Sequence, residues 1–173
     1  MTIFDAAILG VVEGLTEFLP ISSTAHLFLV GDLLKLPISE FQKSFDITIQ
    51  LGAILSVVVL YWKLLFDFQV IKRLLAAFVP TGLIGLAIYK VAKIYLLGNT
   101  TLMLWALFLG GILLILFEYR KSGNGDLKNS NETKISDISY KHSFLIGIFQ
   151  AVAIIPGVSR SAATIIGGTW LGI

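Results

Sequence analysis

The chain has 173 residues, of which 56% are hydrophobic and only 14% are charged, and its formal net charge is +2. Soluble domains carry about 25% charged residues, so this composition and a mean hydropathy of +0.88 indicate a surface that meets hydrocarbon. The basic residues form no clustered face, which argues against nucleic acid as a partner. Cysteine is absent, which excludes disulfides and thiolate metal sites.

The first apolar segment, about residues 3–36, does not read as a simple membrane span. Glu13, Glu17, Pro20 and His26 interrupt it, and each half is shorter than the ~20 residues that a span needs. Non-helical backbone at membrane depth is tolerated where it is buried in protein or lines a wet cavity. We therefore predict a re-entrant helical hairpin.

Three uninterrupted apolar segments follow, at about residues 45–66, 74–94 and 98–118, and we predict that each spans the membrane. The polar stretch 120–141 is rich in Ser, Asn, Gly and Lys and is predicted to be a loop. Basic residues concentrate in this loop and in the segment 63–73, which places both in the cytoplasm and lets the first hairpin enter from the outer side.

The last segment, residues 142–173, repeats the pattern of helix, break and helix. Aligning Gly10 with Gly147 places Ser22 on Ser159. Three spans separate the two copies, so the second hairpin must enter from the opposite face, as in inverted repeats. We expect one all-α polytopic membrane domain over residues 1–173, in which residues 1–119 form the first repeat. The second repeat is expected to be incomplete, with about three spans missing from a truncated chain.

Two acidic residues in the first hairpin are candidates for chemistry. Glu13 and Glu17 are spaced i, i+4 and share one face of a helix. Carboxylates inside an apolar helix are costly and often functional, and this pair could hold Mg²⁺ or Ca²⁺, or one could act as a base. The alternative is a solvated helix end at the interface.

Hydroxyl groups and a histidine follow Pro20. Ser23 and His26 are spaced i, i+3, which predicts a hydrogen bond between hydroxyl and imidazole, the arrangement that activates a nucleophile. Ser22 and Thr24 flank this pair. The alternative is an ordinary helix N-cap by a hydroxyl side chain.

The second hairpin offers an anion site. Ser159, Arg160 and Ser161 open a helix after a Pro-Gly break, where free N–H groups and a guanidinium attract phosphate. Thr164 lies one turn later and could add a hydroxyl. The alternative for Arg160 is pairing with a structural carboxylate. Taken together, the acids, hydroxyls, histidine and arginine indicate phosphoryl transfer or hydrolysis.

Two motifs closely resemble the signatures of the undecaprenyl-pyrophosphate phosphatase family (BacA/UppP). They are Glu13-Gly-Leu-Thr-Glu17-Phe-Leu-Pro-Ile-Ser-Ser-Thr-Ala-His26 and Pro156-Gly-Val-Ser-Arg-Ser161, and the stretch from Phe45 to Leu55 is also similar. The resemblance implies a multi-pass enzyme of the bacterial inner membrane, with re-entrant hairpins and an active site open to the periplasm. It would release phosphate from undecaprenyl pyrophosphate, recycle the lipid carrier for cell-wall synthesis and confer bacitracin resistance.

The resemblance also implies roles for individual residues. Glu13 and Glu17 would serve the cation and catalysis, Ser23 would be the nucleophile, His26 the proton-transfer partner, and Arg160 the pyrophosphate clamp. The expected partners are the polyprenyl pyrophosphate substrate and membrane lipid, with a homodimer as a candidate assembly. A lipid-phosphate transporter or flippase is the rival hypothesis, since inverted repeats and broken helices also typify transporters.

Overall fold

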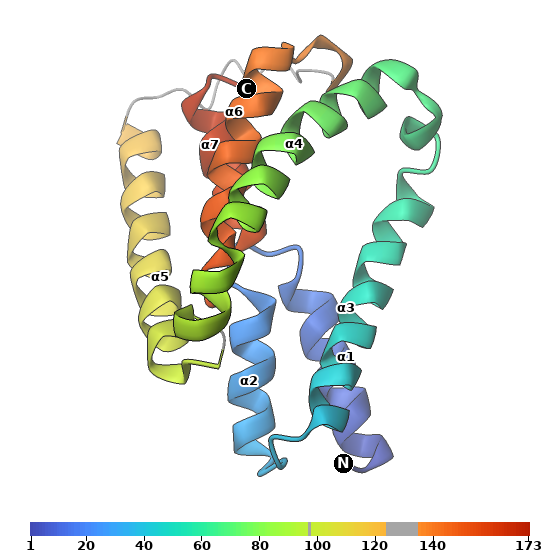
Figure 1. Cartoon of the computed structure of the whole chain (residues 1–173), viewed down its shortest axis with the longest axis vertical. Coiled ribbons are helices and arrows are strands. Elements are labelled where there is room, and N and C mark those ends of the chain that lie inside the picture. The colour runs from blue at the N-terminus through green and yellow to red at the C-terminus, as the bar shows by residue number, and fades with distance from the viewer. Residues whose placement is uncertain (97, 124–134) are drawn as a thin grey trace.

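The computed structural model describes residues 1–96, 98–123 and 135–173, and these ranges form seven α-helices (Figure 1). No strand occurs within these ranges, so the expected all-α fold is confirmed. Short turns of 3₁₀ or π geometry lie at Leu64–Phe66, Ala92–Leu96, Ile135–Asp137 and Val152–Ile154. The helices are α1 (Ile3–Thr16), α2 (Ser23–Leu33), α3 (Glu40–Leu60), α4 (Phe68–Val91), α5 (Thr100–Gly123), α6 (Tyr140–Ala151) and α7 (Arg160–Trp170).

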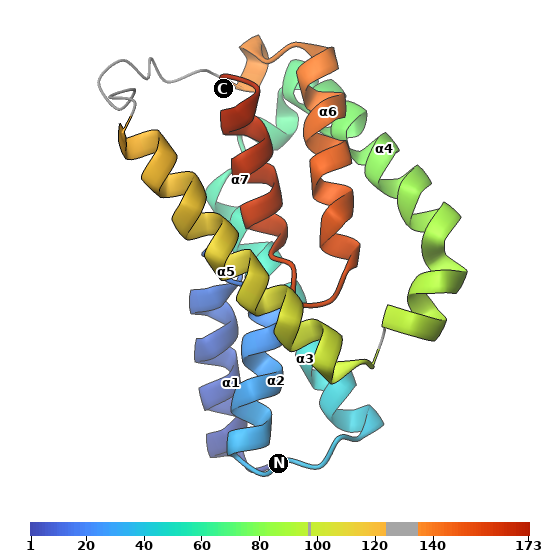
Figure 2. The same ribbon diagram turned by 90° about the vertical axis from the view of Figure 1, so that its left-hand side faces the viewer.

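Two hairpins of short helices face one another. The hairpin of α1 and α2 occupies one end of the molecule and that of α6 and α7 the other, with their turns meeting in the middle (Figures 1 and 2). At 1.5 Å per residue, none of these helices reaches the ~30 Å of a hydrocarbon core. Neither hairpin therefore contains a helix long enough to cross a membrane, and the re-entrant topology stays a prediction.

The two hairpins also match in register. The alignment of Gly10 with Gly147 places Ser23 on Arg160 and Leu33 on Trp170, which are the first and last residues of α2 and α7. Two 11-residue helices thus begin and end at equivalent positions and run in opposite directions in the molecule (Figure 1). This arrangement is that of an inverted repeat.

Within the described ranges, three helices are long and apolar enough to cross a membrane, and their apolar side chains are largely exposed. The candidate spans are Glu40–Leu60, Phe68–Leu96 and Thr100–Arg120. Side chains such as Val59, Leu86 and Ile115 are at least 71% exposed. Such a surface is stable in hydrocarbon, and the protein is therefore a multi-pass membrane protein.

Two of these helices begin earlier than the hydropathy pattern predicts, because polar caps precede the apolar runs. The Ser39 hydroxyl accepts a hydrogen bond from the Gln42 N–H at 3.2 Å, so α3 starts at Glu40 rather than near residue 45. The Asp67 carboxylate accepts from the Gln69 N–H at 2.8 Å and starts α4 at Phe68 rather than near residue 74. Capping satisfies N–H groups that lack a helical partner.

The second hairpin is packed tightly against α4. A Cβ on Gly147 would lie 2.0 Å from the Ala77 carbonyl oxygen and 2.6 Å from Pro80 Cγ. The Thr81 hydroxyl donates to the Gly147 carbonyl oxygen at 2.7 Å. Glycine thus allows α6 to approach the backbone of α4, and the hydrogen bond fixes the register of the two helices.

The predicted polar loop at 120–141 is described only at its two ends, and residues 124–134 lie outside the described residues. At its far end, Arg73 Nε donates to the Ile138 carbonyl oxygen at 2.6 Å. The Arg73 guanidinium also lies 5.1 Å from the centre of the Tyr140 ring. The start of α4 and the start of α6 are therefore held together.

Candidate active site

The break between α1 and α2 is a tight turn that depends on an unusual backbone conformation. The turn closes with a 2.8 Å hydrogen bond from the Ile21 N–H to the Leu19 carbonyl oxygen. Ser22 then adopts the left-handed region at φ 63° and directly precedes α2. Non-glycine residues rarely occupy this region and tend to do so at functional sites. Ser22 is buried, and its hydroxyl makes no capping hydrogen bond to the N–H groups of α2.

The turn brings Glu17 and Ser23 together. The Ser23 hydroxyl donates a short hydrogen bond to Glu17 Oε2. The predicted hydrogen bond between Ser23 and His26 is therefore wrong, because the Ser23 side chain points back across the turn toward α1. A carboxylate that accepts a hydroxyl proton can serve as the base for that hydroxyl.

His26 is held by the backbone of the same turn. Its Nδ1 lies 2.9 Å from the Ser22 carbonyl oxygen. Because a carbonyl oxygen only accepts, the Nδ1–H donates in this contact. The fixed ring orientation leaves Nε2 available to another group.

Glu13 is the most deeply buried acidic residue. Its side chain is 1% exposed, and neither carboxylate oxygen has a hydrogen-bond partner among the described residues. Glu17 and Asp46 are the like charges that act on it, and Arg160 is the opposite charge. An orphaned buried carboxylate is costly unless a positive group satisfies it.

Glu13 and Glu17 are one helical turn apart, and both offer carboxylate oxygens. Both donors are the oxygen ligands that Mg²⁺ and Ca²⁺ prefer. No cluster of three or more His, Asp or Glu side chains with metal-binding geometry occurs in the described part of the chain. Water or substrate oxygens would therefore complete the coordination, which is usual for Mg²⁺.

The break before α7 requires glycine. Gly157 has φ 94°, and a Cβ there would lie 2.2 Å from the Met103 carbonyl oxygen in α5. Ser159 then caps α7 by accepting from the Ala162 N–H at 3.1 Å. The N-cap alternative that was considered for the hydroxyls after Pro20 is not seen in the first hairpin, because the Ser22 side chain makes no capping hydrogen bond to α2.

Ser161 connects the two hairpins. Its hydroxyl donates at 2.9 Å to the Leu19 carbonyl oxygen in the first turn. It also lies 2.9 Å from the Ser159 hydroxyl. Thr164, in contrast, donates to the carbonyl oxygens of Arg160 and Ser161 in its own helix and does not line the cavity between the hairpins.

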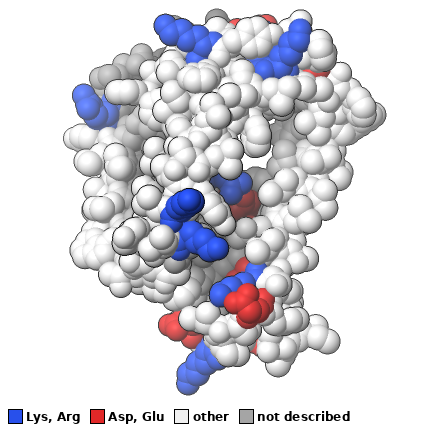
Figure 3. All heavy atoms as spheres, in the orientation of Figure 1, with Lys and Arg blue, Asp and Glu red and all other residues white. Residues whose placement is uncertain are grey.

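The tips of the hairpins enclose a small polar cavity of about 70 Å³. Arg160 lies in its wall and forms no ion pair within 4.0 Å among the described side chains, so the structural-pair alternative is not seen. On the face in Figure 3, acidic and basic atoms appear together inside a central hollow. The lining includes Glu17, Ser22, Ser23, Thr24, Ser159 and Arg160, and also Gln50.

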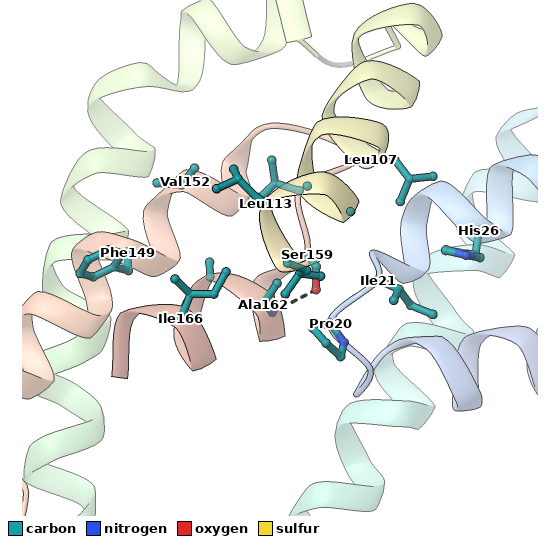
Figure 4. A pocket seen from close by; sticks show the side chains of 16 residues that line it. Pro20, Ile21, His26, Leu107, Leu113, Phe149, Val152, Ser159, Ala162 and Ile166 are labelled. Atoms are coloured by element: carbon teal, nitrogen blue, oxygen red, sulfur yellow. Dashed lines mark hydrogen bonds between the residues drawn. The ribbon is translucent and has the colours of Figure 1, made fainter. Parts of the chain in front are cut away.

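A larger apolar cavity of about 480 Å³ adjoins the polar one through Gly157, Val158 and Ser159. Leu107, Leu113, Phe149 and Ile166 contribute apolar walls from three helices (Figure 4). His26 and Ser159 are polar side chains at its edge. A ligand whose anionic group lies in the small cavity could thus extend an apolar chain into the larger one.

Gln50 was not predicted as a site residue. It lies on α3 within an apolar run and lines the polar cavity opposite the hairpins. The signal was present, since an amide in a membrane span is costly and often functional. An amide carries no charge, so a search for charged residues in an apolar segment does not find it.

Comparison with known proteins gives consistent matches. The family model described as bacitracin resistance protein BacA matches residues 6–173. Undecaprenyl-diphosphatase of Sulfurihydrogenibium sp. is 49% identical over 174 residues, covering 100% of this chain and 66% of the relative. Proteins of the same name are 46% identical in Aquifex aeolicus and 44% identical in Bdellovibrio bacteriovorus, covering 66% and 64% of those relatives. The chain thus spans slightly less than two thirds of the length of these relatives.

Proposed function

This chain belongs to the bacitracin resistance protein BacA family, and we propose that it hydrolyses undecaprenyl diphosphate to undecaprenyl phosphate and inorganic phosphate. The observation that carries this proposal is the hydrogen bond between Ser23 and Glu17 in a cavity shared with Arg160. A hydroxyl on a carboxylate, opposite a guanidinium, is suited to phosphoryl transfer.

In the proposed reaction, Ser23 Oγ attacks the terminal phosphorus while Glu17 Oε2 takes the hydroxyl proton. The bond from that phosphorus to the bridging oxygen breaks, and undecaprenyl phosphate leaves. Water then hydrolyses the phosphoserine, releasing inorganic phosphate and restoring the hydroxyl. Arg160 holds the phosphate oxygens, and His26 Nε2 is the proton-transfer partner.

A divalent cation held by Glu13 and Glu17 would neutralise charge on the diphosphate oxygens. The burial of Glu13 without a partner supports this assignment. Apart from the cation, the groups that position the substrate are side chains and backbone groups of this chain. The Ser159 and Ser161 hydroxyls lie beside the Arg160 backbone at the start of α7.

The proposed location is the bacterial inner membrane, with the site open to the periplasm and the basic loops in the cytoplasm. The concentration of Lys and Arg around residues 63–73 and 120–141 supports this orientation. There the reaction would recycle the lipid carrier for cell-wall synthesis and confer bacitracin resistance. A homodimer stays a prediction.

The test is phosphate release from a polyprenyl pyrophosphate by the whole chain in detergent. We expect Ser23→Ala, Glu17→Ala and Arg160→Ala each to lower turnover at least ~100-fold, because each removes a reacting or charge-stabilising group. Thr48→Ala is the matched control, since its hydroxyl donates to the Ser44 carbonyl oxygen on an exposed face of α3. Parental turnover in all three variants, with intact folding, contradicts the assignment.

The rival hypothesis of a lipid-phosphate transporter or flippase is less well supported. Transport needs a phosphate-binding group such as Arg160 but no hydroxyl paired with a base. A vesicle-sidedness assay alongside phosphate release separates the two. Movement of labelled lipid phosphate without phosphate release would favour transport.

A further inference from the structure

A second cavity, on the other side of the polar one, is lined by a polar stripe along α3. It measures about 320 Å³, and its walls come from α2, α3, the start of α5 and Pro156. Gln42, Asp46 and Gln50 all line it, and their i, i+4 spacing places them on one face of the helix. The face of α3 that turns away from lipid is therefore polar from its first turn to Gln50.

The three residues of this stripe differ in their hydrogen bonding. Gln42 Nε2 donates to Asp46 Oδ1 at 2.9 Å, so these two side chains satisfy each other. The half-buried Gln50 amide forms no hydrogen bond with any described group. Its two N–H donors are therefore free to bind a ligand in the cavities that it lines.

Gln50 also stands where the two cavities join. Thr24, Gln50 and Pro156 line both the 320 Å³ cavity and the 70 Å³ polar cavity. In the polar cavity, Gln50 shares the wall with Glu17, Ser23 and Arg160. Its amide thus faces the space that the proposed substrate's phosphates would occupy, from a helix outside both hairpins.

We propose that Gln50 is a substrate-binding residue whose Nε2 donates a hydrogen bond to a non-bridging phosphate oxygen of the prenyl diphosphate. The inference rests on the proposed function for the identity of this ligand. A neutral donor on α3 adds a contact to the phosphate from a helix that does not carry Arg160, and it adds no further charge to the cavity. The membrane span α3 is then a third wall of the site.

Two assays with the whole chain in detergent test this. The first measures phosphate release from a prenyl pyrophosphate, and the second measures equilibrium binding of a prenyl methylene-bisphosphonate, whose carbon bridge resists hydrolysis. A hydrogen bond to a charged group predicts that Gln50→Ala weakens binding about ten- to a hundredfold. KM should rise more than kcat falls, because the contact exists in both the ground and transition states.

Gln50→Glu keeps the shape of the side chain but replaces the donor with a negative charge. It should weaken binding at least as much as Gln50→Ala, because it repels the phosphate. Gln150→Ala is the matched control, since this half-buried amide lies on α6 and lines a different cavity with Ile71, Leu74 and Phe78. Its binding and KM should equal those of the parent.

The outcomes separate this inference from the proposed function. Unchanged binding and KM in both Gln50 variants overturn the inference while phosphate release by the parent sustains the function. Binding that depends on Gln50, with no phosphate release by the parent, sustains the inference and contradicts the function. A parent that neither binds nor hydrolyses overturns both.

Discussion

The Ser161 hydroxyl donates a 2.9 Å hydrogen bond to the Leu19 carbonyl oxygen, joining the turns of two hairpins that are 142 residues apart in the chain. The groups proposed for catalysis are divided between these turns, with Glu17 and Ser23 on one and Arg160 on the other. The distance between nucleophile and phosphate clamp therefore depends on this contact.

Ser161→Ala removes this contact, and we expect it to lower both turnover and thermal stability. A hydrogen bond of this kind contributes about 1 kcal/mol to the free energy of unfolding. Ser56→Ala is the control, because the Ser56 hydroxyl donates to the Ala53 carbonyl oxygen within its own helix. Thermal unfolding and phosphate release measure the two effects, and equal losses in both variants would show that Ser161 has no special role.

Glu13→Gln tests whether the buried carboxylate holds a cation. Without cation, the variant should be more stable than the parent by about 1 kcal/mol or more, because a buried charge without a partner is removed. Added Mg²⁺ should raise the unfolding temperature of the parent but not of the variant. Glu118→Gln, an exposed change on α5, should keep the parental response. An equal Mg²⁺ response in parent and Glu13→Gln would exclude Glu13 as a ligand.

Because Ser22 has a left-handed backbone, glycine should be more stable than alanine at this position, the reverse of the order inside a helix. Ser22→Gly should be more stable than Ser22→Ala by about 1 kcal/mol, because a Cβ is unfavourable at φ 63°. At Ser56, inside α3, the order should be the opposite, since glycine costs about 1 kcal/mol in a helix. Chemical denaturation of the four variants measures both differences, and the same order at both positions would refute this conformation of Ser22.

Gly147→Ala should separate α6 from α4. The added Cβ would overlap the Ala77 carbonyl oxygen, and overpacking of this kind costs about 1–3 kcal/mol. Gly10→Ala is the matched control at the equivalent position of the first hairpin, where nothing lies within 4 Å of the added atom. Unfolding temperatures in detergent compare the two, and a Gly147→Ala protein as stable as Gly10→Ala would argue against this packing.

Much of the architecture follows from the sequence because it depends on hydrophobicity and chain length. Long apolar runs predicted α3, α4 and α5, and the polar interruptions around Pro20 and Pro156 predicted the two breaks. The beginnings of α3 and α4 differed because Ser39 and Asp67 cap these helices ahead of their apolar runs. A hydropathy pattern does not detect such N-caps, because the capping residues are polar.

The site was less predictable because it depends on backbone geometry in the turns. Sequence spacing placed Ser23 beside His26, but the left-handed Ser22 directs the Ser23 hydroxyl toward Glu17. A glycine in the sequence indicates that a left-handed conformation is accessible, whereas a serine gives no such indication. Gln50 was detectable as an amide within an apolar span, but only the packing of α3 in the fold shows that it lines the polar cavity.

The inverted hairpins have an electrostatic consequence of their own. Helices α2 and α7 both begin at the polar cavity, where Ser23 and Arg160 are their first residues. Each helix start carries roughly half a positive charge from its peptide groups, and these groups have no proton to lose near neutral pH. The C-terminal end of α1 lies at the same cavity, at Glu17, and carries the opposite partial charge, which the Arg160 guanidinium offsets. Part of the attraction of this cavity for phosphate therefore comes from the backbone and does not depend on any one side chain.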